Sequence, residues 1–302
     1  MHDTIIIGGG IAGMTAAMYA ARKKIDFEIF TSEPGGQFMV SGEVLNYPGI
    51  VKTTGVDFAM TMEEQMKFNK VDVKTETVKT VTREGTNFKV TTDKGEYDTK
   101  TVIVASGARA RKLGVPGEDK FAKRGVTYCS ICDGPLFAGK TVAVVGGGDA
   151  ALEAVDFLKD IVSKMYLLVR GDSFTGHEYL IEQVKKNDKV DILFNADTTE
   201  IRGDQFVSGM KYKQGDEEKQ LELQGVIIEI GRVPNTEPFK DLLKLDDHNH
   251  IEIDCQGHTS VPGIFAAGDC AAGHEYQYVI AAGQGCMALI KAARYLAHKE
   301  EE

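Results

Sequence analysis

Clustered positive charge is one of the things that this sequence lacks. The 302-residue chain has 35 lysines and arginines against 45 aspartates and glutamates, which gives a net charge of −10. Proteins that bind DNA or RNA neutralise phosphates with clustered lysine and arginine. The acidic balance therefore argues against a nucleic-acid-binding protein.

Cysteine is also scarce. A small secreted domain held together by disulfides needs many cysteines at regular spacings. This chain has five, and only the first two form a CxxC pair: Cys129, Cys132, Cys255, Cys270 and Cys286. A disulfide scaffold is therefore excluded, and the CxxC becomes the cysteine feature of interest.

Long apolar runs are absent as well. The longest runs have the length of a strand, whereas a membrane-spanning helix needs about 20 apolar residues. The N-terminal stretch MHDTIIIGGG enters a strand directly, without the basic and apolar regions of a signal peptide. These features predict a cytoplasmic protein that is not embedded in a membrane.

The chain contains a strand, a glycine-rich turn and a helix near its start, in TIIIGGGIAGMTAAMYAA at residues 4–21. In its GxGxxG, Gly8 allows a tight turn, Gly10 lets a pyrophosphate approach the backbone, and Gly13 allows close helix packing. The phosphates then meet the N–H groups of the helix N-terminus. This stretch predicts a dinucleotide site.

The same pattern recurs at residues 141–158, TVAVVGGGDAALEAVDFL, with Gly146, Gly148 and Ala151 at the three positions. Alanine is an accepted third residue. Two such sites in one chain favour a flavin together with a nicotinamide, because electrons must both enter and leave. A second fold kept only as a scaffold would have the same pattern, so the sequence leaves occupancy of this site open.

The length and the repeat together predict two α/β domains. Hairpin-like alternations at residues 87–107 and 207–231 follow the two repeats. We therefore expect two doubly wound Rossmann-like folds, each with a small antiparallel insert. The tail is too short to fold alone and is expected to return to the first domain. This predicts one domain over residues 1–113 and 243–302, with residues 114–242 inserted.

YCSICDG, at residues 128–134, is the third chemical feature. Two cysteines at this spacing form a small redox disulfide, and the spacing lowers the thiol pKa and speeds exchange. Asp133, next to Cys132, is a candidate to exchange a proton with the departing thiolate. We interpret Cys129 and Cys132 as a redox pair.

The rival interpretation of the CxxC is half of a zinc site. The other half would come from Cys255 and His258, with His248 and His250 nearby. Zinc needs four converging ligands, and the two cysteine groups lie more than 120 residues apart in sequence. The redox interpretation is preferred, and no metal is expected.

Together, the motifs resemble the low-molecular-weight thioredoxin reductase family, the class II pyridine nucleotide-disulfide oxidoreductases. The segments occur in the family's order across nearly the whole chain: IIIGGGIAG, GGQF, EVLNYPG, YCSICDGPLF, VVGGGDAALEA, IGRVPN, FAAGDC and AAGQGCMA. The most specific of them is the CxxCDG placed just before the second GGG.

The resemblance implies an FAD domain built from both chain ends, an inserted NAD(P)-type domain that carries the CxxC, and a homodimer. It also implies these flavin contacts: Gly8, Gly10, Gly13, Gly36, Gln37, Asn46, Gly268, Asp269 and Gln277. The family normally has Arg-Gln where this sequence has Tyr276-Gln277.

The same resemblance implies roles for the redox residues. Cys132 would be the thiol nearer the flavin, Cys129 the thiol that attacks the partner's disulfide, and Asp133 the acid. Electrons would pass from a donor to FAD, then to the Cys129–Cys132 disulfide and on to a thioredoxin-like protein.

The donor is the open question. Family members that use NADPH bind its 2′-phosphate with a His-Arg-Arg sequence and a further arginine after the second strand. The matching positions here are Val169, Arg170, Gly171 and Thr175, so a single arginine remains. Losing two contacts of about 1.5–3 kcal/mol each weakens binding about 10²- to 10⁴-fold.

NADH is not established either, because Val169 stands where an acid should bind the ribose, and Asp172 comes three residues late. Reduced ferredoxin or a reduced deazaflavin is a third kind of donor. Two other functions stay open: a flavin oxidoreductase acting on another disulfide, and a non-enzymatic flavin redox sensor.

Overall fold

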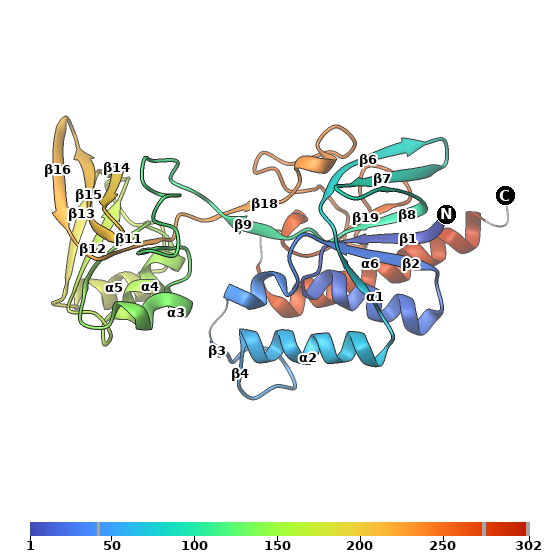
Figure 1. Cartoon of the computed structure of the whole chain (residues 1–302), viewed down its shortest axis with the longest axis horizontal. Coiled ribbons are helices and arrows are strands. Elements are labelled where there is room, and N and C mark those ends of the chain that lie inside the picture. Colours follow the sequence, from blue (N-terminus) through green and yellow to red (C-terminus); the bar gives the residue numbers. More distant parts are fainter. Residues whose placement is uncertain (41–42, 274–275, 300–302) are drawn as a thin grey trace. The chain divides into compact units, whose positions relative to one another are not determined.

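The computed structural model describes residues 1–40, 43–273 and 276–299. The chain divides into two compact units (Figure 1). Unit 1 contains Met1–Arg109 and Val233–Glu302, and unit 2 contains Ala110–Arg232. The chain passes between them within β9 (Ala108–Ala110) and β18 (Arg232–Pro234). The expected domain limits, after residue 113 and at residue 243, lie four and ten residues further along the chain.

A seven-stranded sheet forms the centre of unit 1, in the order β5-β2-β1-β8-β7-β6, with β19 also paired to β8. Its parallel strands are β1 (His2–Ile7), β2 (Phe27–Thr31), β5 (Val73–Thr75), β8 (Glu96–Val104) and β19 (Ile264–Ala266). The antiparallel insert consists of β6 (Val78–Glu84) and β7 (Asn87–Thr92). Because β19 pairs with β8, both ends of the chain contribute to one sheet.

Three helices, α1 (Ile11–Lys23), α2 (Gly55–Phe68) and α6 (Tyr278–Lys299), pack against one face of this sheet (Figure 1). Side chains alternate along a strand, so Ile6 contacts this helical layer while Ile5 and Ile7 face the opposite core. Shorter elements complete the unit: β3 (Glu43–Val44), β4 (Thr53–Thr54), and the 3-10 turns η1 (Gly36–Val40), η3 (Glu237–Phe239) and η4 (Gly268–Cys270).

Unit 2 has a five-stranded parallel sheet in the order β10-β17-β11-β12-β13. These strands are β10 (Val126–Thr127), β17 (Gly225–Ile228), β11 (Thr141–Val145), β12 (Lys164–Val169) and β13 (Val190–Phe194). The antiparallel insert contains β14 (Ala196–Gly203), β15 (Val207–Gln214) and β16 (Glu217–Glu222).

The helical elements of unit 2 are α3 (Ser130–Asp133), η2 (Gly134–Phe137), α4 (Asp149–Leu158) and α5 (Glu178–Lys185). From β11 the chain continues outward to β12 and β13, and β17 then pairs with the other edge of β11. The strand order therefore reverses between β11 and β17. In open α/β sheets, the carboxyl ends of such strands border the ligand crevice.

The predicted fold class is confirmed: both units are doubly wound α/β folds with an antiparallel insert. The C-terminal helix α6 begins at Tyr278 and runs to Lys299. Among the described residues, no helix has the length and apolar character that crossing a membrane requires.

The close approach of α1 and α6 depends on a glycine of α6. A Cβ at Gly285 on α6 would lie 2.1 Å from the backbone oxygen of Ala12 on α1, whereas one at Gly283 would meet no atom within 4 Å. Gly285→Ala is expected to lower the free energy of unfolding by about 1–3 kcal/mol because the helices must separate. The matched control Gly283→Ala should raise it by about 0.5–1 kcal/mol, since alanine favours a helix. Denaturant unfolding measures both, and equal effects would contradict this account of the packing.

Candidate functional site

A cavity of about 520 Å³ lies in unit 1 beside the first glycine-rich turn. Cavities of several hundred Å³ are the usual size of small-molecule sites. Six of the residues expected at a flavin are among those that line it: Gly8, Gly10, Gly36, Gln37, Gly268 and Asp269. The sequence-based set therefore converges on one cavity, although its members come from both ends of the chain.

The glycines of this turn have distinct roles. Gly8 has a positive φ of 123°, and a Cβ there would lie 2.0 Å from the oxygen of Ala105. A Cβ at Gly13 would lie 1.8 Å from the oxygen of Gly8. Gly10, the N-cap of α1, has open space instead, and no side chain caps this helix. The turn thus presents the first N–H groups of α1 beside the cavity, as a bound pyrophosphate requires.

Asn46 and Gln277 are brought together, but not at the cavity wall. The Asn46 side-chain amide donates to Gln277 Oε1 at 3.1 Å, and neither residue is among the described residues that line the cavity. Tyr276, where the family has arginine, bonds through its hydroxyl to His250 Nε2 at 2.8 Å. The adjacent Tyr278 lines the cavity and donates to the Gln37 backbone oxygen at 3.1 Å.

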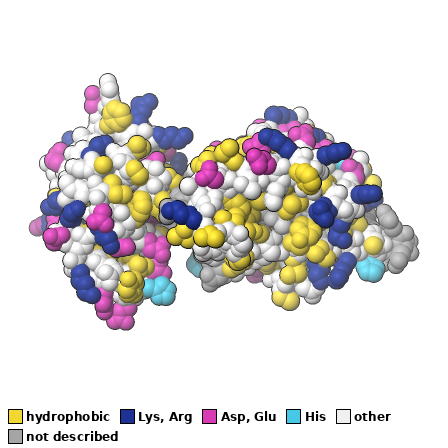
Figure 2. Space-filling model, turned by 90° about the horizontal axis from the view of Figure 1, so that it is seen from below, with side chains coloured by type: hydrophobic (Ala, Val, Ile, Leu, Met, Phe, Trp, Pro, Cys, Tyr) yellow, Lys and Arg dark blue, Asp and Glu magenta, His cyan; other side chains and the backbone are white. Residues whose placement is uncertain are grey.

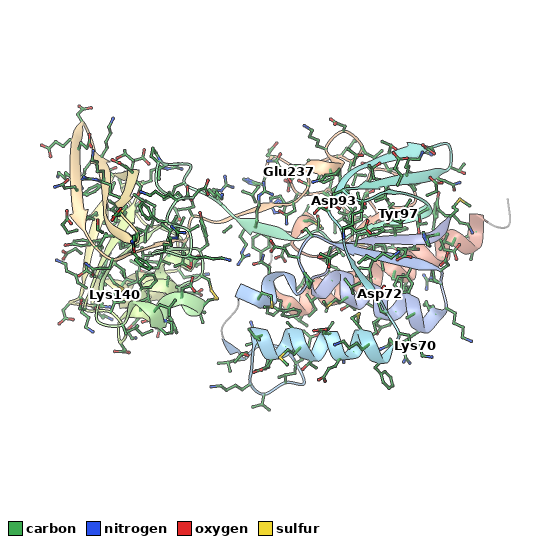
Figure 3. The ribbon with its side chains drawn as sticks, viewed as in Figure 1. Lys70, Asp72, Asp93, Tyr97, Lys140 and Glu237 are labelled. Carbon is green, nitrogen blue, oxygen red and sulfur yellow. A yellow bond between two sulfur atoms is a disulfide. The ribbon has the colours of Figure 1, made fainter. Side chains whose placement is uncertain are left out.

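Four charged residues that line this cavity were not predicted from the sequence: Glu33, Glu76, Arg109 and Glu237. Glu33 follows β2, twenty residues after Gly13. That is the spacing at which an acid binds a ribose in this fold, so the signal was available. Arg109 donates to Asn235 Oδ1 at 2.8 Å and pairs with Glu237, which is labelled in Figure 3. No local sequence pattern predicts a role for Arg109 at the cavity, because its partners Asn235 and Glu237 are distant in sequence.

The CxxC forms a disulfide between Cys129 and Cys132, with their Cα atoms 5.4 Å apart. It lies where the chain leaves β10 and begins α3. Cys129 is the N-cap of α3, and its Sγ accepts the N–H of Cys132 at 3.1 Å. Cys132 is exposed and Cys129 half-buried. An N–H directed at a sulfur stabilises a thiolate there once the bond is reduced.

Asp133 is tied to the same segment. Its carboxylate accepts the Thr127 hydroxyl at 2.5 Å, and its N–H donates to the Cys129 carbonyl at 3.2 Å. The structure thus places this acid next to the pair and orients it from β10.

The second glycine-rich turn has the same kind of close backbone approach as the first. Gly146 has a φ of 148°, and a Cβ there would lie 2.1 Å from the Glu229 oxygen and 2.8 Å from the Ala151 Cβ. Gly148 is the N-cap of α4, again without a side-chain cap. The local geometry of a dinucleotide fold is therefore retained in unit 2.

The segment after β12 folds back onto this turn. Val169 is buried, and a Cβ at Gly147 would press on it at 2.8 Å. Thr175 donates its backbone N–H to the Gly147 oxygen at 2.9 Å, while Arg170 is exposed. The positions expected to bind a 2′-phosphate thus offer one arginine at the surface.

Glu229, which the sequence analysis did not single out, follows β17 at the point where the strand order reverses. Its carboxyl is largely buried, which raises its pKa from 4.5 to about 7. Hydrogen bonds from the backbone and side chain of Ser130 and the charge of Arg232 oppose this shift, and Glu153 adds to it. Only the pairing of β17 with β10, the strand that leads into the CxxC, brings this acid to that segment.

The alternative zinc site has no counterpart in the part of the chain that the structure describes. No group of three or more histidine, cysteine, aspartate or glutamate side chains is arranged there to hold a metal. His258 instead bonds through Nδ1 to Asp254 at 2.9 Å, and Cys255 is an exposed thiol.

Comparison with known proteins defines the class. Residues 2–294 match the family model described as pyridine nucleotide-disulphide oxidoreductase, and the chain belongs to that family. It is 39% identical to a thioredoxin reductase of Mycolicibacterium smegmatis, over 99% of this chain and 98% of that protein.

Two further comparisons extend this picture. A solved structure, Lactococcus lactis thioredoxin reductase, superimposes with a TM-score of 0.87 at 33% identity, covering 99% of this chain and 100% of that one. A Bacillus subtilis NADH dehydrogenase is also 39% identical over 97% of this chain, but this chain spans only 58% of that relative's length. Within the family, the chain is thioredoxin reductase-like over nearly its whole length.

The raised pKa of Glu229 makes stability depend on pH. The folded carboxyl keeps its proton up to about pH 7, whereas the unfolded one loses it near pH 4.5, so ionisation favours unfolding as pH rises between these values. Glu229→Gln removes this penalty. We expect the variant to gain about 2 kcal/mol in free energy of unfolding at about pH 8 relative to about pH 5.

Urea unfolding at both pH values measures this gain. Glu222→Gln, which changes an exposed carboxyl on β16, is the matched control and should show no such pH dependence. A gain of the same size at both pH values would mean that the carboxyl at position 229 has an ordinary pKa.

Proposed function

We propose that this protein is an FAD-dependent disulfide reductase that passes electrons through Cys129–Cys132 to a disulfide of a thioredoxin-like protein. The observation that carries the proposal is the CxxC disulfide at the start of α3, with an N–H directed at Cys129 Sγ. The dinucleotide-type cavity of unit 1 and the thioredoxin reductase relatives support it.

The residues of the unit 1 cavity fit FAD. The uncapped N–H groups of α1, next to Gly10, would hold the pyrophosphate, and Glu33 would bind the adenosine ribose. Gly36–Gln37 and Gly268–Asp269 would hold the remainder. Bound FAD would supply two-electron transfer to a disulfide. We therefore assign the FAD role to unit 1, and the NAD(P)-type fold with the redox pair to unit 2.

Each redox residue receives a separate role in this proposal. On reduction, the S–S bond breaks as two electrons and a proton are taken up, leaving one thiol and one thiolate. Cys129 carries the thiolate, because its Sγ accepts the Cys132 N–H, and it attacks the partner's disulfide. Cys132 then displaces the partner and reforms the bond. Asp133, held by Thr127, is proposed to supply and accept the proton.

Serine variants test these roles. Cys129→Ser and Cys132→Ser are both expected to lower thioredoxin turnover to background while the flavin stays bound. Cys132→Ser should accumulate a mixed disulfide with an oxidised thioredoxin, because Cys129 can still attack but no second thiol is present to displace the thioredoxin from it. Cys255→Ser, which removes an exposed thiol outside the pair, is the control and should keep full turnover. Full turnover by Cys129→Ser would refute the mechanism.

On the electron-input side, we propose that the protein recognises the 2′-phosphate of NADPH poorly. Val169 is buried, Gly171 has no side chain to offer, and Thr175 is held at the glycine-rich turn, so Arg170 is left as the cationic contact. Asp172, which is exposed beside it, adds a like charge to that of the phosphate. NADH, reduced ferredoxin and a reduced deazaflavin remain the donors to compare with NADPH.

Anaerobic bleaching of the flavin by these four donors in parallel tests this proposal. The initial rate with NADPH is expected to exceed that with NADH by less than about tenfold. Gly171→Arg/Thr175→Arg should raise the apparent affinity for NADPH by about 10²-fold or more, with little effect on NADH, because the new charges meet only the phosphate. Rapid bleaching of the unmodified protein by NADPH alone would contradict the proposal.

A homodimer in a reducing cytoplasm completes the proposal. Large apolar side chains are exposed on α2 and α6, and Figure 2 shows hydrophobic side chains across the visible face of unit 1. Such a surface favours association with a second copy. Cys255, Cys270 and Cys286 are free thiols, in keeping with a compartment that maintains cysteines reduced.

A further inference from the structure

Glu229 lies between the glycine-rich turn of unit 2 and the redox disulfide. Its backbone N–H donates to the Val145 oxygen at 2.8 Å, and its own oxygen lies against Gly146, so the residue is fixed at the carboxyl ends of β17 and β11. β17 pairs in parallel with β10, and Thr127 lies opposite Ile227, so Glu229 stands beside the start of the CxxC segment. There the backbone and side chain of Ser130 are the hydrogen-bond partners of its carboxyl.

Ser130 is the residue through which this carboxyl reaches the CxxC. It directly follows Cys129, it begins α3, and it is 7% exposed. Holding its N–H fixes the backbone between the two sulfurs. The same contact places a titratable carboxyl next to the atoms that must bear a negative charge when the disulfide is reduced.

We propose that Glu229 is a positioning residue for the redox pair, which holds Ser130 in place and adjusts the reactivity and reduction potential of Cys129–Cys132 through its own charge. This role of Glu229 rests on the proposed disulfide reductase function only for the source of the electrons. The effect on reduction potential concerns the Cys129–Cys132 pair alone.

The direction of the effect follows from the charge balance of reduction. Two electrons and one proton convert the disulfide into a thiol and a thiolate, so one negative charge appears in the segment. An ionised Glu229 repels that charge, raises the thiol pKa and favours the disulfide. A protonated Glu229 removes the repulsion and favours the reduced pair. Protonation of one carboxyl thus makes the pair a better electron acceptor.

The charged groups that act on this carboxyl are few. Arg232 favours its ionised form, and Glu153 on α4 opposes ionisation. The flanking strands β10 and β11, Val126–Thr127 and Thr141–Val145, consist of uncharged residues. On α3, the carboxylate of Asp133 is engaged by Thr127. Burial therefore dominates and brings the pKa of Glu229 to about 7.

The test measures the redox pair directly and needs no partner protein. Flavin-loaded wild type and Glu229→Gln are equilibrated with mixtures of reduced and oxidised dithiothreitol, whose oxidation to a cyclic disulfide supplies two electrons and two protons. Alkylation followed by mass spectrometry then gives the reduced fraction of Cys129–Cys132. At about pH 8.5, the variant is expected to favour the reduced pair about three- to tenfold more than wild type, which is about 15–30 mV. At about pH 5.5 the two proteins should agree.

A pH profile of iodoacetamide alkylation of the reduced pair gives a second readout. Wild type should show an additional inflection near pH 7 that Glu229→Gln lacks. Glu222→Gln is the control and should match wild type in both assays. Arg232→Gln, which keeps the carboxyl but removes the cation beside it, should move the inflection to higher pH.

Two results would overturn the inference. One is a Glu229→Gln shift of equal size at both pH values, which would indicate a purely structural role. The other is an unchanged inflection in Arg232→Gln, which also decides the matter if Glu229→Gln folds poorly. Failure of the protein to reduce a thioredoxin would leave these measurements unaffected, so the inference and the proposed function can fail separately.

Discussion

The close approach of backbone to backbone at the two strand–turn–helix junctions is the constraint on which the rest of the structure depends. At Gly8, Gly13 and Gly146, a single additional carbon would overlap a main-chain oxygen at about 2 Å. Because these positions have no side chain, short glycine turns are enough to connect β1 to α1 and β11 to α4. Their uncapped N–H groups then border the crevices in which an anionic ligand can be held.

Two carboxyls hold the redox segment on either side, the buried Glu118 and the partly exposed Glu229. Glu118 is 2% exposed and accepts hydrogen bonds from the N–H groups of Leu113 and Gly114 and from the Tyr128 hydroxyl. Burial, together with Glu118, raises the pKa of Tyr128, so the phenol remains a donor. Glu229 accepts hydrogen bonds from Ser130, but these offset only part of the cost of removing its charge from water, so its pKa is raised. The segment before Cys129 is thus held by Glu118, whose carboxylate accepts three hydrogen bonds. The segment after Cys129 is held by Glu229, whose pKa is about 7.

The two units differ in the residues that follow the second strand after each glycine-rich turn. After β2, unit 1 has Glu33 at the cavity, where an acid can bind ribose hydroxyls. After β12, unit 2 has the buried Val169 and the exposed Arg170. Unit 1 therefore has an acid at this position, whereas unit 2 has a dinucleotide-type turn and the CxxC but a single exposed arginine at the corresponding positions.

The sequence by itself determined both Rossmann-like folds, their antiparallel inserts and the cysteine pair, because each follows from a local pattern of strand, glycine turn, helix or CxxC spacing. It also indicated six cavity residues, Gly8 and Gly10 from the glycine-rich motif and Gly36, Gln37, Gly268 and Asp269 through family resemblance. Only the tertiary structure decided that Asn46 and Gln277 bond to each other, that Arg109 lies between Asn235 and Glu237, and that Glu229 reaches Ser130. These contacts depend on which distant segments become neighbours in the fold, and on how deeply a carboxyl is buried there. A short stretch of sequence specifies neither the neighbours nor the burial.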